Sequence, residues 1–319
     1  MIENWRHKLL IPNKLARGAL GEFFGTFLLV FIGDCIVAQT VLSGKVTAHA
    51  TNAWININVG WGFAIVFCIL VVGRSSGGHI NPAVTVLLYT FGAVNALTTV
   101  VYCIAQTVGA FFGAAAVYLY YYDAMNAYHQ DLYTNPRKYF GISVGNSANW
   151  LEQLNAADKL KYMHLTAGMY CSFPQFYLSL GGAFVDQMVG TLILCLFIAA
   201  IIDKRNEIPA HLHALMFGFV VIMIGCSLGM NVGYPINPAR DFGPRRAHPT
   251  YFLMPILGPL VGGVLGGWIY YLFSGFQIVT PEEAAAHKNH GHAGSNIAHH
   301  KEEATILLSK QEDTAVKNA

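Results

Sequence analysis

Long apolar runs separated by short polar stretches make up most of the chain. Six of these runs have about the 20 residues that a helix needs to cross a bilayer core. They are expected to form six transmembrane helices at residues 19–42, 54–74, 96–122, 183–202, 210–228 and 250–273. The pattern therefore predicts an all-α, polytopic membrane protein.

Two stretches of the chain repeat one pattern at one spacing. Residues 62–90 read GFAIVFCILVVGRSSGGHINPAVTVLLYT, and residues 218–246 read GFVVIMIGCSLGMNVGYPINPARDFGPRR. Each begins with Gly-Phe, breaks at a glycine-rich segment and resumes with Asn-Pro-Ala. The Asn follows the first Gly by 19 residues in both, at Asn81 and at Asn237. This repeat indicates two copies of one structural unit.

Each Asn-Pro-Ala motif predicts the start of a helix too short to cross a membrane. Asn is a strong N-cap, and Pro suits the first helical position. We expect half-helices at 81–91 and 237–246, each about 15 Å long or half a bilayer core. Such backbone is tolerated only where it packs in protein or lines a wet cavity. If their N-termini meet, both positive dipole ends and both Asn amides face one lumen, and each NH2 is free to donate into it.

Composition supports a membrane protein and gives no sign of an enzyme. Of 319 residues, 54% are hydrophobic and 11% are charged, whereas soluble domains have about 25% charged residues. The net charge of +2 gives no reason to expect a nucleic-acid partner. The six cysteines lie in or beside apolar runs without metal-ligand spacing, and we interpret them as reduced packing residues. With no nucleophile–base pair, the sequence predicts no catalytic residues, no metal and no cofactor.

Polar segments divide the chain and suggest its orientation. Basic residues before the first span favour a cytoplasmic N-terminus, and six spans return the C-terminus to the same side. A short leader with a cleavage site is not expected. The organisation we predict is a cytoplasmic N-terminal tail at 1–18, a first repeat at 19–122, a long extracellular loop at 123–182 with some helix at 150–163, a second repeat at 183–273 and a disordered cytoplasmic tail at 274–319.

The segments GGHINPAVT and NPARDFGPR resemble the paired signature motifs of the aquaporin (major intrinsic protein) family, and the second resembles its aquaglyceroporin branch. The similarity covers roughly residues 19–273. It implies the aquaporin fold, with six spans and two re-entrant half-helices in inverted repeats. It also implies a homotetramer in the plasma membrane that conducts glycerol, water and other small neutral solutes such as urea, while excluding protons and ions.

Further site residues follow from that resemblance by position. Spacing from the two Asn residues implies a selectivity filter of Trp61, Gly225, Tyr234 and Arg240. In this interpretation Gly225 widens the gap, two aromatic rings form an apolar corner, and Arg240 donates to hydroxyl groups. The resemblance also implies that the two signature motifs consist of Asn81, Pro82, Ala83, Asn237, Pro238 and Ala239. It further implies that the lumen is lined by the backbone carbonyls of Gly77, Gly78, His79, Gly233, Tyr234 and Pro235.

Supporting polar residues complete the prediction. The resemblance implies that Glu22 accepts hydrogen bonds from a re-entrant loop. Gln187 stands at the matching position of the second repeat, where relatives usually have Glu, and we expect it to accept a weaker bond. Asp241 and Arg245 have the i, i+4 spacing of a helical ion pair. Asp34 is unusual for the family; it could pair at a subunit contact or lie near the outer surface, and we assign it no transport role.

Two other functions stay open at this stage. A water-dominant channel with weak glycerol conduction would share the same motifs. An ion-coupled transporter also uses broken helices and inverted repeats, but it needs acidic residues near the midplane. In the tail, five His residues between 287 and 300 suit a solvated segment, and residues Glu303 to Leu308 have the form of a dileucine signal for a sorting adaptor.

Overall fold

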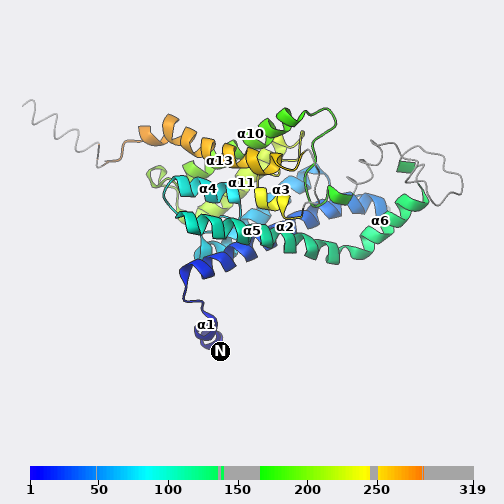
Figure 1. Ribbon diagram of the computed structural model, residues 1–319, viewed down its shortest axis with the longest axis horizontal. Coiled ribbons are helices and arrows are strands. Elements are labelled where there is room, and N and C mark those ends of the chain that lie inside the picture. The colour runs from blue at the N-terminus through cyan, green and yellow to red at the C-terminus, as the bar shows by residue number, and fades with distance from the viewer. Residues whose placement is uncertain (48, 136–137, 140–165, 245–250, 282, 284–319) are drawn as a thin grey trace, which may run out of the picture. The chain divides into compact units, whose positions relative to one another are not determined.

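The structure is a computed structural model that describes residues 1–47, 49–135, 138–139, 166–244, 251–281 and 283 (Figure 1). The chain divides into two units, Met1–Tyr271 and Leu272–Ala319. The candidate site lies wholly within the first unit. The helix expected at 150–163, Arg245, the His-rich tail and the dileucine segment lie outside the described residues.

Six helices in the described part of the chain are long and apolar enough to cross a membrane, which confirms the prediction of six spans. The first is longer than predicted because Asn13 caps it, with its side-chain oxygen accepting from the Ala16 N–H at 3.0 Å. The described elements are α1 (Ile2–Leu9), α2 (Lys14–Val46), α3 (Trp54–Ser76), α4 (Pro82–Thr90), α5 (Ala96–Tyr120), α6 (Tyr122–Thr134), α10 (Leu180–Ile202), η1 (Lys204–Asn206), η2 (Ala210–Leu212), α11 (His213–Leu228), α12 (Pro238–Phe242), α13 (Met254–Phe273) and η3 (Gly275–Gln277).

Glycines four residues apart bring two pairs of helices into close backbone contact, once in each repeat. A Cβ atom on Gly109 of α5 would lie 2.2 Å from the Phe23 carbonyl oxygen of α2. A Cβ atom on Gly262 of α13 would lie 2.0 Å from the Met188 carbonyl oxygen of α10. Only glycine permits either approach. The α2–α5 pair therefore corresponds to the α10–α13 pair, which supports the predicted repeat.

The two half-helices begin where the Asn-Pro-Ala motifs predict, but they differ in length. In α4, the Asn81 side-chain oxygen accepts from the Ala83 N–H at 2.9 Å. In α12, the Asn237 side-chain oxygen accepts from the Ala239 N–H at 3.1 Å. Helix α4 has 9 residues, as expected, whereas α12 has only 5. The predicted end of the second half-helix at 246 is therefore wrong, because α12 already ends at Phe242.

Candidate functional site

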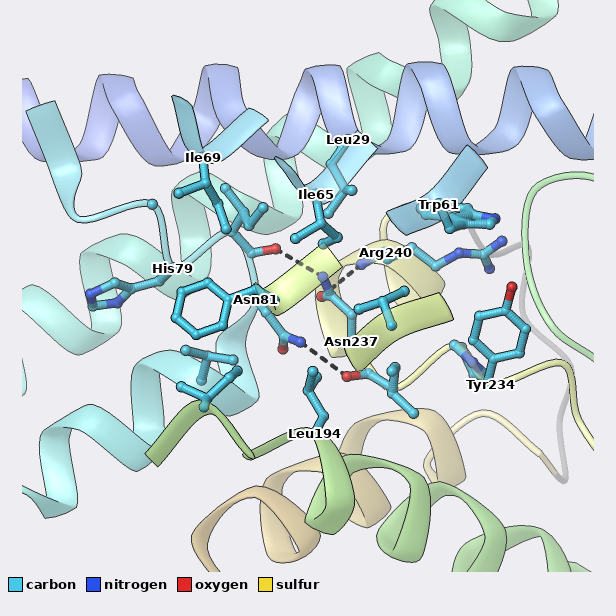
Figure 2. Close-up of a pocket in the computed structure, with 18 of the residues that line it drawn as sticks. Leu29, Trp61, Ile65, Ile69, His79, Asn81, Leu194, Tyr234, Asn237 and Arg240 are labelled. Atoms are coloured by element: carbon cyan, nitrogen blue, oxygen red, sulfur yellow. Dashed lines mark hydrogen bonds between the residues drawn. The ribbon is translucent and has the colours of Figure 1, made fainter. Parts of the chain in front are cut away.

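The two half-helices are joined through their N-terminal residues. The Asn81 side-chain NH2 donates to the Ile236 carbonyl at 3.0 Å, and the Asn237 NH2 donates to the Ile80 carbonyl at 2.8 Å. Figure 2 shows these two bonds crossing between the loops. The sequence interpretation left both NH2 groups entirely free for the lumen, and that part is wrong. Each amide has two N–H bonds, so one remains beyond the bond to the opposite loop.

Strained backbone precedes each Asn. Ile80 has a φ of 44° and Ile236 a φ of 39°, a left-handed conformation that β-branched residues rarely adopt. Their carbonyls are the groups that accept the crossed Asn bonds. Strain of this kind costs about 1–3 kcal/mol and persists where the surroundings over-determine it. The matching φ values show that the two loops have the same backbone conformation just before each Asn.

A cavity of about 140 Å³ runs beside the joined half-helices. Figure 2 shows His79 near one end, Trp61, Arg240 and Tyr234 near the other, and Asn81 and Asn237 between them. One part of its wall is aliphatic or aromatic, from Leu29, Ile65, Ile69, Val84, Leu88, Leu194, Ile198, Ile202, Phe217 and Val221. The six residues predicted to supply carbonyls, Gly77, Gly78, His79, Gly233, Tyr234 and Pro235, also line it.

Three of the four predicted filter residues meet at one end of this cavity. The Arg240 guanidinium lies over the Trp61 ring, 5.0 Å from its centroid. Tyr234 lines the same end. The aromatic face of Trp61 and the N–H groups of Arg240 therefore stand side by side, with one apolar and one donating surface.

Gly225 does not line the cavity, contrary to the expectation that its missing side chain widens the gap. It lies behind Tyr234: a Cβ atom on Gly225 would be 2.6 Å from Tyr234 Cζ and 2.6 Å from Asn58 Oδ1. The Tyr234 hydroxyl donates to Asn58 Oδ1 at 2.6 Å, and Trp54 packs edge-on against the Tyr234 ring. The absent side chain thus makes room for the tyrosine, which occupies the space.

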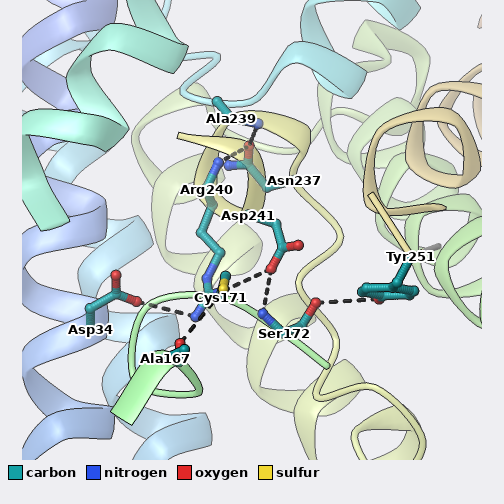
Figure 3. Close-up of polar contacts among 9 residues, drawn as sticks. All are labelled: Asp34, Ala167, Cys171, Ser172, Asn237, Ala239, Arg240, Asp241 and Tyr251. Carbon is teal, nitrogen blue, oxygen red and sulfur yellow. Dashed lines mark hydrogen bonds and ion pairs between the residues drawn. The ribbon is translucent and has the colours of Figure 1, made fainter. Parts of the chain in front are cut away.

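Arg240 is held by two carboxylates, and one of them comes from the first span. Asp34 Oδ1 lies 3.1 Å from Arg240 Nη2, and Asp241 Oδ1 lies 3.2 Å from Nη1 (Figure 3). Both acids are fully buried. Asp241 also accepts from the Ser172 N–H at 2.6 Å, which ties the segment before α10 to the site. The Asp34 carboxylate is therefore paired within this chain and not at the suggested subunit contact, whereas a position near the outer surface of the membrane stays a prediction.

Glu22 supports the first re-entrant loop as the resemblance implied. Its two carboxylate oxygens accept from the backbone N–H groups of His79 at 2.9 Å and Ile80 at 2.7 Å. The Gln106 amide of α5 donates to the same carboxylate at 2.7 Å and to Thr85 of α4 at 2.9 Å. These charge-assisted bonds satisfy loop backbone that would otherwise be unpaired in the membrane.

The second repeat lacks this support, so the acceptor role expected of Gln187 is wrong. Its side-chain oxygen is buried without a hydrogen-bond partner among the described residues. Because α13 packs on α10 as α5 packs on α2, Pro259 occupies the position that Gln106 has in the first repeat. Pro235 corresponds to His79, since each lies two residues before the Asn of its motif. Pro has no N–H to offer. The second repeat therefore lacks counterparts of all three groups that support the first loop: the Glu22 carboxylate, the His79 N–H and the Gln106 amide.

Asp34 was noted in the sequence without its partner Arg240, Asn58 was not noted, and Gly225 was placed in the lumen wall. A buried acid in an apolar span signals a partner, so an unpaired arginine in the other repeat could have been sought. Pro235 carried a clear signal as well, because a proline at that register cannot donate to a supporting side chain. No comparable sequence signal marks Asn58, whose partner Tyr234 lies 176 residues away.

Crossed half-helices, paired repeats and an enclosed lumen define a polytopic helical membrane protein with the aquaporin fold. The family model described as major intrinsic protein matches residues 11–270. The chain is 36% identical to aquaporin-9 from Homo sapiens over 300 residues, covering 90% of this chain and 91% of that protein. It is 35% identical to the probable glycerol uptake facilitator protein from Thermotoga maritima, covering 79% and 97%.

A solved structure agrees with these sequence matches. The X-ray structure of the aquaglyceroporin from Plasmodium falciparum superimposes with a TM-score of 0.61 at 26% identity, covering 80% of this chain and 95% of that one. The chain belongs to the major intrinsic protein family. It is a multi-pass membrane protein of the aquaglyceroporin group.

Proposed function

We propose that this protein is a passive channel for glycerol and water that also admits urea and other small neutral solutes. One observation carries the proposal: two capped half-helices meet through crossed Asn bonds beside a lumen that Trp61, Tyr234 and Arg240 line at one end. The relatives named as aquaporin-9 and as a glycerol uptake facilitator support it.

The wall chemistry suits a polyol. The Trp61 and Tyr234 rings and the aliphatic wall offer contact to the C–H edge of glycerol, while Arg240 offers N–H donors to its hydroxyl oxygens. Deeper in the lumen, the second N–H of each Asn amide and the six loop carbonyls replace the hydrogen bonds that the solute leaves behind in water. We therefore assign Trp61, Tyr234 and Arg240 to the selectivity filter, with Gly225 acting behind Tyr234.

Exclusion of protons and cations follows from the charges at the lumen. The N-termini of α4 and α12 both point their positive dipole ends at the two Asn residues. A cation or a proton carried by a water chain meets these ends together, which raises its barrier at mid-membrane.

Ion-coupled transport finds little support at this site. A transporter would need acids near the midplane, but the two acids of α2, Glu22 and Asp34, bind loop backbone and Arg240 respectively. Asp186 accepts from the Asn231 amide at 2.9 Å. The described residues that line the cavity include no acid, so a coupling ion would find no carboxylate there. A water-dominant channel would differ from our proposal only in having a much lower ratio of glycerol permeability to water permeability.

The surroundings we propose are the plasma membrane, with both termini cytoplasmic and four copies of the chain in one assembly. The basic residues in the segment before α2 favour this orientation. Residues Glu303 to Leu308 would then face the cytoplasm, where a sorting adaptor could bind them. Neither point affects how the lumen selects its solutes.

Stopped-flow light scattering on vesicles containing the purified protein tests the proposal. An inward glycerol gradient first shrinks the vesicles, and their reswelling reports glycerol entry. We expect reswelling much faster than in protein-free vesicles, with no dependence on a sodium or proton gradient. Glycerol entry no faster than in protein-free vesicles, alongside rapid water flow, would favour the water-dominant alternative. Flux that requires an ion gradient would indicate a transporter.

A further inference from the structure

The acid in the first span is the residue that the proposed conduction path leaves unexplained. Asp34 lies in the middle of α2, fully buried, 206 residues from its partner Arg240. Its Oδ1 binds the guanidinium, while its Oδ2 has no hydrogen-bond partner in the described part of the chain. A buried carboxylate is costly in a membrane span unless it is compensated or functional.

The geometry points to Asp34 as a positioning residue that holds Arg240 back from the lumen and so sets the width of the filter. The inference rests on the proposed conduction of glycerol. Figure 3 shows Asp34 and Asp241 on two sides of the Arg240 guanidinium. Asp241 is the next residue on the same half-helix, whereas Asp34 is on another helix. Among the described residues, Asp34 is thus the acid that ties the guanidinium to a neighbouring helix.

The residue beside Asp34 positions the opposite side of the filter. A Cβ atom on Gly33 would lie 2.2 Å from the Trp61 ring, so the ring packs directly on the α2 backbone. The Arg240 guanidinium contacts the same ring, 5.0 Å from its centroid. Two consecutive residues of α2 thus place both the apolar and the donating member of the filter.

When the Asp34 carboxylate is removed, the surroundings of Arg240 determine the direction in which its guanidinium moves. Buried N–H groups need acceptors, and the freed Nη2 group has the protein interior on one side and the lumen on the other. The Arg240 side chain is already 11% exposed. Water in the lumen can accept the freed N–H, so the guanidinium moves inward. The narrower opening slows glycerol more than water, and a four-carbon polyol more than glycerol.

Asp34→Ala and Asp34→Asn test this, with Asp186→Asn as the matched control. Asp186 is an acid in another span, α10, that binds the Asn231 amide rather than Arg240, so its change removes a carboxylate that has no contact with the Arg240 guanidinium. Water, glycerol and erythritol permeabilities are measured for each variant in the same vesicle preparation. We expect Asp34→Ala to lower the glycerol-to-water ratio about tenfold, equivalent to a barrier change of about 1.4 kcal/mol, and the erythritol-to-glycerol ratio further.

Asp34→Asn separates the carboxylate charge from its shape, since the amide oxygen can still accept from Arg240 through a weaker bond. We expect ratios between those of wild type and Asp34→Ala, and wild-type ratios for Asp186→Asn. If Asp34→Ala fails to assemble, Asp34→Asn decides alone by a lowered glycerol-to-water ratio. Unchanged ratios in the Asp34 variants would overturn the inference while wild-type conduction stands. Absence of glycerol flux in wild type would instead refute the proposed function.

Discussion

A methyl group at position 225 has no room in this structure, and the consequence for transport can be worked out. The Cβ atom of Gly225→Ala would lie 2.6 Å from Tyr234 Cζ, where ordinary contact begins at 3.4 Å, so the ring must move by about 0.8 Å. Tyr234 lines the lumen and Gly225 does not. The ring is therefore pushed inward, toward Trp61 and Arg240.

The size of the effect combines packing and hydrogen bonding. Overpacking of this kind costs about 1–3 kcal/mol, and part of it appears as a strained Tyr234–Asn58 hydrogen bond, which is 2.6 Å in the present structure. If about 1.4 kcal/mol of this cost is added to the barrier for glycerol, its permeability falls about tenfold. Water is smaller, so we expect its permeability to fall less.

The assay compares glycerol and water permeabilities of wild type, Gly225→Ala, Tyr234→Ala and the double variant in vesicles. A double-mutant cycle isolates the coupling between two neighbouring residues. Gly225→Ala should lower the glycerol-to-water ratio in the wild-type background and have little effect once Tyr234 is Ala, because there is no ring to displace. An equal change in the glycerol-to-water ratio in both backgrounds would refute the reasoning and would indicate that Gly225 lines the lumen directly.

The unequal support of the two loops gives a matched pair of stability predictions. Glu22→Gln removes the charge that two loop N–H groups share, and we expect a loss of about 1–3 kcal/mol, measured as a lower Tm in detergent. Gln187→Glu introduces the acid that the first repeat has at the matching position, Glu22, yet Pro235 offers no N–H, so the new carboxylate stays poorly compensated. We expect destabilisation by about 3–5 kcal/mol; a raised Tm would show that the second loop can accept such support.

Much of the fold could be predicted because the responsible residues act locally. Apolar runs of sufficient length give the spans, and Asn followed by Pro gives each half-helix its start. The end of α12 carried a sequence signal that the predicted end at 246 overlooked, because Gly243 and Pro244 follow Phe242 directly and both disfavour a continuing helix. Equal spacing of the two Asn motifs was enough to predict that the half-helices meet.

The site was predicted where spacing fixes it and missed where packing does. Trp61 and Arg240 keep fixed offsets from the two Asn residues and do lie together. The role of Gly225 depends on a ring and an amide that fold back against it, and a glycine reveals no such neighbours in sequence. Asp34 acts through a residue in the other repeat, so its role becomes visible only when both halves are assembled.

The most direct test of the account is an experimental density map of the protein in a membrane mimetic containing glycerol. The account predicts Asn81 and Asn237 joined to the opposite loops, with a glycerol molecule in the lumen beside the stacked Trp61 ring and Arg240 guanidinium. Its carbon edge should face Trp61 and its hydroxyls Arg240. Half-helix ends that lie apart, or a lumen filled by side chains at mid-membrane, would contradict it.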